Sequence, residues 1–130
     1  MVDTSKLKYT STHEWVSLSG RTATVGITDH AQKEISDVVF IELPKTDRII
    51  KQKESAMVIE SVKAAFDIYA PVSGKITAVN EKLKNNPELV NQSPMDKGWL
   101  FKIECANPAE FKTLLSHEEY QASSSGHAAH

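Results

Sequence analysis

The chain has 130 residues, 40% of them hydrophobic and 25% charged, which is the composition of one soluble globular domain. The formal net charge of −2 and the lack of a basic stripe argue against nucleic acid as a partner, and no apolar run approaches the roughly 20 residues that span a membrane. The single cysteine, Cys105, excludes an internal disulfide and a zinc–cysteine cluster.

The first half of the chain predicts short strands and one short helix. Hydrophobic residues alternate with polar ones on either side of Ser19-Gly20, which indicates a hairpin. Thr28-Asp29 is typical of a helix N-cap, because a short polar side chain accepts hydrogen bonds from the free amides of the first turn. We therefore expect a hairpin over residues 14–27, a helix over 30–35, a strand over 38–43 that ends at Pro44, and a polar connection over 45–53.

The second half continues this pattern. The expected elements are strands over residues 54–61, 66–70, 75–79 and 99–104, a long connection over 80–98, and a helix opened by Asn107-Pro108 that carries Phe111, Leu114 and Leu115 at helical spacing. Short strands with frequent turns predict a mostly β fold, a small sandwich or barrel with helices only at its margins. Residues 122–130 are poor in apolar side chains, so we expect one domain over 1–121 followed by a disordered tail.

A lysine lies at the centre of one predicted turn. Strands flank Lys63 on both sides, and the small residues Ala64 and Ala65 follow it. This arrangement presents an amine away from the body of the protein, where a modifying enzyme could reach it and where the long side chain could become the base of a mobile arm. Most turn lysines are only solvated, so position alone does not decide between the two interpretations.

Four separated stretches carry motifs that occur together in one family. They are Lys8-Tyr9 with Thr12-His13-Glu14-Trp15-Val16; residues 25–32 with 38–44; residues 60–74; and Val79-Asn80-Glu81 with residues 87–91 and Gly98-Trp99. In this order and spacing the chain resembles the glycine cleavage H-protein. The turn Val-Lys-Ala also separates it from biotin carriers, which have Met-Lys-Met, and from acyltransferase lipoyl domains, which have Asp-Lys-Ala.

The resemblance implies a barrel-sandwich hybrid of the lipoyl-carrier type, with short peripheral and C-terminal helices. It places covalently bound lipoate on Lys63, with Glu60, Ser61, Val62 and Ala64 as the neighbours that form the attachment motif. It also implies a carrier and not an enzyme, without catalytic residues of its own.

The resemblance further implies the partners of this carrier. The arm would take an aminomethyl group from a glycine decarboxylase (P-protein) to an aminomethyltransferase (T-protein), and electrons to dihydrolipoamide dehydrogenase (L-protein); a fourth enzyme would attach the lipoate. We expect a monomer. Because the first ten residues show neither a secretory signal nor an Arg-rich transit peptide, we expect a bacterial cytoplasm, or the mitochondrial matrix for a processed organellar protein.

An aminomethyl group on the arm is cationic and would hydrolyse in water, so a cleft lined by carboxylates could hold and protect it. Guided by the resemblance, we predict that Glu14 and Asp67 line this cleft, with Thr12 as a hydrogen-bond partner. The alternative for both acids is a solvated position at a strand end.

Three other functions stay open. A carrier of the same kind could relay lipoate to other lipoyl proteins. An enzyme could use Lys63 as a Schiff-base nucleophile, which would require desolvation and a pKa well below roughly 10.4. A plain β interaction module would carry no prosthetic group. His13 and His30 have no nucleophile or acid partner at working spacing, so we expect structural or capping roles for them and no metal site.

The chain departs from the family pattern at four places. Ser36 stands where glycine is common, and Lys45-Thr46-Asp47 lacks the usual glycine, so we expect a different turn type in both loops. Phe66 replaces a small polar residue near Lys63, where it could shield the arm or hinder a modifying enzyme. Met95 stands where tyrosine is usual.

Overall fold

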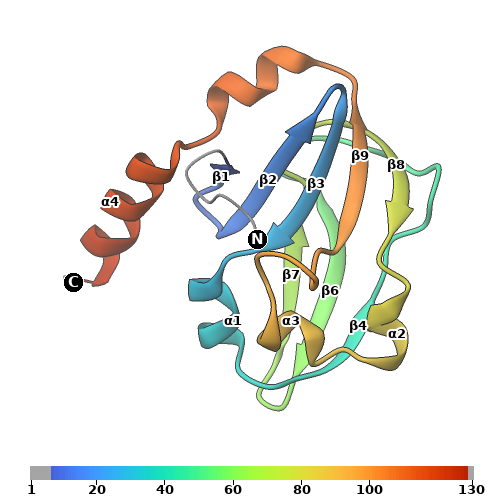
Figure 1. The fold of residues 1–130 in the computed structure, drawn as a ribbon, viewed down its shortest axis with the longest axis vertical. Helices are drawn as coiled ribbons and strands as arrows, with labels where there is room; N and C mark the ends of the chain where they lie inside the picture. Colours follow the sequence, from blue (N-terminus) through green and yellow to red (C-terminus); the bar gives the residue numbers. More distant parts are fainter. Residues whose placement is uncertain (1–6, 129–130) are drawn as a thin grey trace.

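The computed structural model of the chain describes residues 7–128. Nine strands form two antiparallel sheets that face each other (Figure 1). The larger sheet has the order β1 (Lys8–Tyr9), β2 (Glu14–Ser19), β3 (Thr22–Ile27), β9 (Phe101–Cys105), β8 (Gly74–Val79) and β5 (Ile49–Ile50). The smaller sheet has the order β4 (Val38–Glu42), β6 (Ser55–Ser61) and β7 (Ala65–Tyr69). The mostly β prediction is confirmed.

Short helices lie at the margins of the sheets, as expected. They are α1 (Asp29–Ile35), α2 (Lys82–Asn85), α3 (Leu89–Gln92), the 3₁₀ helix η2 (Pro108–Thr113) and α4 (His117–Ala128). The predicted cap of α1 is confirmed, because the side chain of Thr28 accepts a hydrogen bond of 3.2 Å from the amide of Ala31. Asn107 caps η2 in the same way, through the amide of Ala109 at 3.2 Å.

The main core lies between the two sheets. Inward-facing residues of β3 and β9 alternate with outward-facing ones, so that Val25, Phe101 and Ile103 are fully buried. Ile59 of β6 meets them from the smaller sheet and is also fully buried. Each such side chain contributes about 1.5–3 kcal/mol through removal of its apolar surface from water. Cys105, at the end of β9, belongs to the same core and is a free thiol.

A second hydrophobic cluster joins the start of the chain to α4. Tyr9 and Tyr120 stack with ring centroids 4.7 Å apart, beside the buried Trp15. Trp15 donates a hydrogen bond of 2.9 Å to the carbonyl of Pro94, and its indole covers the backbone of Gly26. Met95, which replaces the usual tyrosine, packs against this cluster. The cluster therefore holds β1 and the first turn of α4 against β2.

Several elements differ from the sequence-based expectation. The connection over residues 80–98 contains α2 and α3, and the two-residue strands β1 and β5 were not expected. The predicted helix after Asn107 ends at Thr113, because Leu115 forms an antiparallel bridge with Tyr9. The following helix, α4, extends to Ala128, so part of the predicted disordered tail is helical. Residues 129 and 130 lie outside the described residues.

The two loops that lack glycine keep a backbone that glycine adopts most easily. Ser36 has φ 74° and ψ −158°, and Asp47 has φ 69°. Both turns therefore contain a residue at positive φ although neither has glycine at that position. The difference in turn type from the family stays a prediction. At Ser36 the backbone is held by hydrogen bonds to Gln32 and Asn91.

Candidate functional site

Lys63 lies in the exposed turn between β6 and β7, at the lower end of the molecule in Figure 1. Ser61 shapes this turn: its amide donates to the carbonyl of Ala64 at 2.8 Å, and its hydroxyl accepts from the amides of Lys63 and Ala64 at 3.2 and 3.3 Å. Among the ion pairs of the described residues, none includes the Lys63 ammonium. The turn is thus fixed by its backbone, while the lysine side chain is accessible.

The turn is braced from β4, and apolar side chains are exposed around it. The amide of Val62 donates a hydrogen bond of 3.0 Å to the carbonyl of Asp37, just before β4. Val39, Phe40 and Val62 are each more than half exposed, at 54%, 53% and 66%. These three residues, here called the turn patch, offer an apolar surface next to the lysine.

Phe66 does not lie in the turn patch. It is the cross-strand partner of the buried Ile59 and packs against the main core, half-buried. Its ring therefore points to the opposite face of β7 from Ala65, which follows from the two-residue period of a strand. Phe66 therefore packs into the core between the sheets and does not cover the amine of Lys63.

One face of β7 leads from the lysine toward the other sheet. Ala65, Asp67 and Tyr69 alternate along this strand and are all exposed, while Ile68 is buried. The side chain of Asp67 accepts a hydrogen bond of 2.8 Å from Ser55. From Ala65 to Tyr69 the strand covers about 13 Å, at about 3.3 Å per residue.

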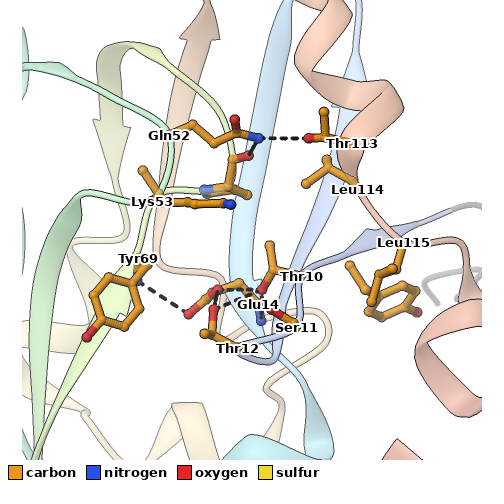
Figure 2. Close-up of a pocket in the computed structure, with 13 residues that line it drawn as sticks. Thr10, Ser11, Thr12, Glu14, Gln52, Lys53, Tyr69, Thr113, Leu114 and Leu115 are labelled. Atoms are coloured by element: carbon orange, nitrogen blue, oxygen red, sulfur yellow. Dashed lines mark hydrogen bonds between the residues drawn. The ribbon is translucent and has the colours of Figure 1, made fainter. Parts of the chain in front are cut away.

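A cleft of about 600 Å³ lies at the Tyr69 end of β7. Four segments that are distant in the sequence form its walls: the β1–β2 connection, the residues before β6, the end of β7 and the residues after η2 (Figure 2). Its lining residues are Tyr9, Thr10, Ser11, Thr12, Glu14, Gln52, Lys53, Tyr69, Ala70, Pro71, Thr113, Leu114 and Leu115.

Glu14 is the buried acid of this cleft, with a relative exposure of 1%. One carboxylate oxygen accepts hydrogen bonds of 2.5 Å from the hydroxyls of both Thr10 and Thr12, and the other accepts a bond of 3.3 Å from the amide of Tyr69. Burial raises the pKa of Glu14, whereas these donors lower it, and burial has the larger effect. All three donors suit the ionised carboxylate, and a positive partner in the cleft would offset its desolvation.

The structure brings two of the three predicted cleft residues together. Thr12 and Glu14 line the cleft and are hydrogen-bonded to each other. Asp67 is absent from the lining and lies on the outer face of β7, between Lys63 and the cleft.

The structure also adds Gln52 and Lys53, which sequence reasoning missed. In Figure 2 the amino group of Lys53 is turned toward the middle of the cleft. Gln52 closes one side through a hydrogen bond of 2.9 Å to Thr113. No local pattern signals either residue, because only the folded chain places them opposite Glu14.

Comparison with known proteins decides the family. Residues 7–127 match the family described as "Glycine cleavage H-protein". The chain belongs to the glycine cleavage H-protein family. It is 54% identical over 114 residues to the glycine cleavage system H protein of Thermotoga maritima, a match that covers 88% of this chain and 92% of that relative. It is 56% identical over 113 residues to the one from Methylacidiphilum infernorum, with 87% and 88% covered.

A solved structure agrees with this assignment. The crystal structure of a glycine cleavage system H protein from Mycobacterium marinum superimposes with a TM-score of 0.85 at 30% identity, covering 93% of this chain and 98% of that one. The barrel-sandwich fold predicted from the resemblance is thereby confirmed. Within the described residues, no helix has the length and apolar character needed to cross a membrane.

Proposed function

We propose that this chain is the lipoyl-carrying shuttle of the glycine cleavage system and that Lys63 holds the lipoyl group. The observation that carries the assignment to Lys63 is the exposure of its amine at the end of a hairpin whose backbone Ser61 and Asp37 hold in place. When bound, the lipoyl group supplies a disulfide that accepts the aminomethyl group of glycine and becomes a dithiol after its release. The protein contributes presentation and protection.

The residues around Lys63 fit an acylated arm. An amide bond to Lys63 removes the ammonium charge, so a neutral arm can lie beside the apolar turn patch or enter an apolar site of a partner. Ala64 adds no bulk next to the amine, and Ser61 uses its hydroxyl on the turn itself. Glu60, near the end of β6, and Val62, in the turn, are both exposed and would contact the lipoate-attaching enzyme.

We assign the protection of the aminomethyl group to the cleft at Glu14. The exposed face of β7 runs toward it over about 13 Å, a span comparable with the reach of an extended acyl-lysine arm. A cationic amine beside the Glu14 carboxylate would offset the cost of burying that charge. Thr12 would hold the carboxylate in place, and Asp67, on the path, would attract the amine before it arrives. Lys53 would oppose this charge and favour release.

Glycine decarboxylase, aminomethyltransferase and dihydrolipoamide dehydrogenase are the proposed partners, and the chain acts between them as a monomeric carrier and not as a catalyst. Residues 1–121 form the proposed lipoyl-carrier domain. Relatives from bacteria and archaea favour a cytoplasmic location over a mitochondrial one.

Lipoylation of Lys63 is tested by intact mass after incubation with a lipoate ligase, ATP and lipoate. We expect one lipoyl adduct on the wild type, one on Lys75→Arg, and none on Lys63→Arg. Lys75→Arg is the matched control, because Lys75 is also exposed but lies in strand β8 and not in the turn. An adduct on Lys63→Arg would refute the assignment. Glycine cleavage with the three partner enzymes then tests the pathway, and transfer of the arm to other lipoyl proteins without glycine cleavage would identify the relay.

The cleft is tested by the rate at which methylamine-loaded protein releases its cargo. Glu14→Gln keeps the shape of the side chain and removes its charge, so we expect faster release than from wild type. Lys53→Gln removes the opposing cation and should slow release. Equal rates for wild type and Glu14→Gln would refute the role of Glu14.

A further inference from the structure

A cluster of three metal-binding side chains lies outside the lysine turn and the cleft. His30 and Glu34 are one turn apart on α1, and His13 reaches them from the β1–β2 connection. One donor atom from each residue lies within 4.8 Å of the other two. The Nε2 atom of His30 is 2.8 Å from a carboxylate oxygen of Glu34, and the ring centroids of His13 and His30 are 4.5 Å apart.

His13 is held in place by its backbone. It has φ 72°, a conformation that costs a non-glycine residue free energy and that persists only when the surroundings enforce it. Its amide donates to the carbonyl of Thr10 at 3.2 Å, and its carbonyl accepts from the amide of Thr28 at 3.0 Å. Because Thr28 is the N-cap of α1, these bonds fix the His13 loop against the start of the helix that carries His30 and Glu34.

A buried tyrosine orients the His13 ring. Nδ1 of His13 is 2.7 Å from the hydroxyl of Tyr120, which is also 2.8 Å from the hydroxyl of Thr28. Tyr120 is only 5% exposed. A hydrogen bond on one ring nitrogen is the usual support of a metal-binding histidine, because it fixes the tautomer and turns the other nitrogen toward the ion. Because Nδ1 of His13 contacts Tyr120, Nε2 would be the atom of His13 that binds the ion.

We infer that His13, His30 and Glu34 form a binding site for a divalent transition metal ion, with Zn²⁺ as the best match. Two imidazoles and one carboxylate form a known three-ligand set of zinc sites, which leaves a fourth position for water or another ligand. Calcium and magnesium prefer all-oxygen ligands and are disfavoured by the two nitrogens.

The side chains need only small movements to close around the ion. Two ligands bound tetrahedrally at about 2.1 Å from zinc are about 3.4 Å apart, compared with at most 4.8 Å in the cluster. His30 and Glu34 are partly exposed, with side-chain exposures of 41% and 60%, and can rotate toward His13. An ion bound here would tie the loop that supplies Thr10 and Thr12 to the cleft onto α1.

The site is tested by calorimetric titration of the full, unlipoylated chain with Zn²⁺, together with the visible absorption of Co²⁺ as a report on coordination geometry. Unlipoylated protein avoids binding to the dithiol and makes the result independent of the proposed carrier function. We expect one ion per chain and a rise in the unfolding temperature with Zn²⁺. His30→Gln and Glu34→Gln, both at exposed positions, should each weaken binding at least tenfold. His13→Asn should do the same, because asparagine tolerates a positive φ.

Two further variants distinguish this site from zinc binding elsewhere on the chain. Tyr120→Phe keeps all three ligands and should weaken binding about tenfold through loss of ring orientation. His127→Gln/His130→Gln removes the two histidines near the C-terminus and should leave the affinity unchanged. The inference is overturned if wild type binds no Zn²⁺ at millimolar concentration, if His30→Gln and Glu34→Gln bind as wild type does, or if only the C-terminal double variant loses the ion.

Discussion

Ser36→Gly should stabilise the protein by relieving backbone strain beside the lysine turn. Ser36 has φ 74° and ψ −158°, a region of backbone space that is essentially restricted to glycine. The residue ends α1, and the next residue, Asp37, braces the amide of Val62. Among the described residues, no hydrogen bond of the Ser36 side chain is found, so the substitution removes no favourable contact of that kind.

The size of the effect follows from two opposing contributions. A non-glycine residue in this region destabilises the folded state by about 1–3 kcal/mol. Glycine removes this strain, but it lowers the free energy of unfolding by about 0.5–1 kcal/mol because its unfolded chain has more conformational freedom. The net gain is about 1 kcal/mol, within a range of about 0–2.5 kcal/mol. With an unfolding entropy of about 2.1 cal/mol/K per residue and 130 residues, 1 kcal/mol corresponds to about 4 °C, so the unfolding temperature should rise by about 4 °C and by no more than about 9 °C.

Thermal and urea unfolding of wild type, Ser36→Gly and Ser36→Ala measures this effect. Alanine removes the hydroxyl but keeps Cβ, so Ser36→Ala should be no more stable than wild type. Equal stabilisation by alanine and glycine would show that the hydroxyl, and not the backbone conformation, is the source. A loss of stability in Ser36→Gly would refute the reasoning altogether.

Three other substitutions test the cleft, the packing of Trp15 and the segment between α1 and β4. Because the pKa of Glu14 is raised in the folded state, the folded protein binds this proton more tightly than the unfolded chain does. The wild type should therefore lose stability as the pH rises from about 4.3, the ordinary pKa of glutamate, through the raised pKa. Glu14→Gln should flatten this pH dependence in urea unfolding between pH 4 and 8, and an unchanged dependence would contradict the prediction. Gly26→Ala would place Cβ 2.5 Å from the Trp15 ring. We expect the free energy of unfolding to fall by about 1–3 kcal/mol and the tryptophan fluorescence to change. An unaltered spectrum and stability would show that the ring can move. Asn91→Ala leaves the amide of Val38 and the carbonyl of Ser36 without their side-chain partner. The substitution should lower the free energy of unfolding by about 2 kcal/mol and speed amide hydrogen exchange over residues 36–38. Unchanged exchange would mean that α1 alone holds this segment.

The strands that could be predicted from the sequence are those whose pattern is local. The hairpin over residues 14–27 and the strands beside Lys63 were found because alternation and turn residues are read within a few positions. β1 and β5 were missed because two residues carry no period, and they exist only through their partners Trp15, Val16, Lys75 and Gly74. The end of the helix after Asn107 was likewise set by a distant partner, Tyr9.

The same distinction between local and long-range determinants applies to the residues of the candidate site. The exposure of Lys63 could be predicted, because it depends on a turn whose hydrogen bonds lie within residues 61–64. Lys53 and Glu14 line the same cleft because four distant segments pack together there. The spacing of residues in the sequence does not predict that packing. The grouping of His13 with His30 is missed for the same reason, since it depends on long-range contacts such as the hydrogen bond from the Thr28 amide to the His13 carbonyl.

The position of the single cysteine matters for a protein proposed to carry a redox-active disulfide. Cys105 is 4% exposed in the main core, and burial raises the pKa of its thiol. Thiol–disulfide exchange requires an accessible thiolate, which this residue does not provide. A lipoyl arm on Lys63 would therefore not be trapped by this cysteine as a mixed disulfide, and the electrons of the reduced arm would remain available to a partner enzyme.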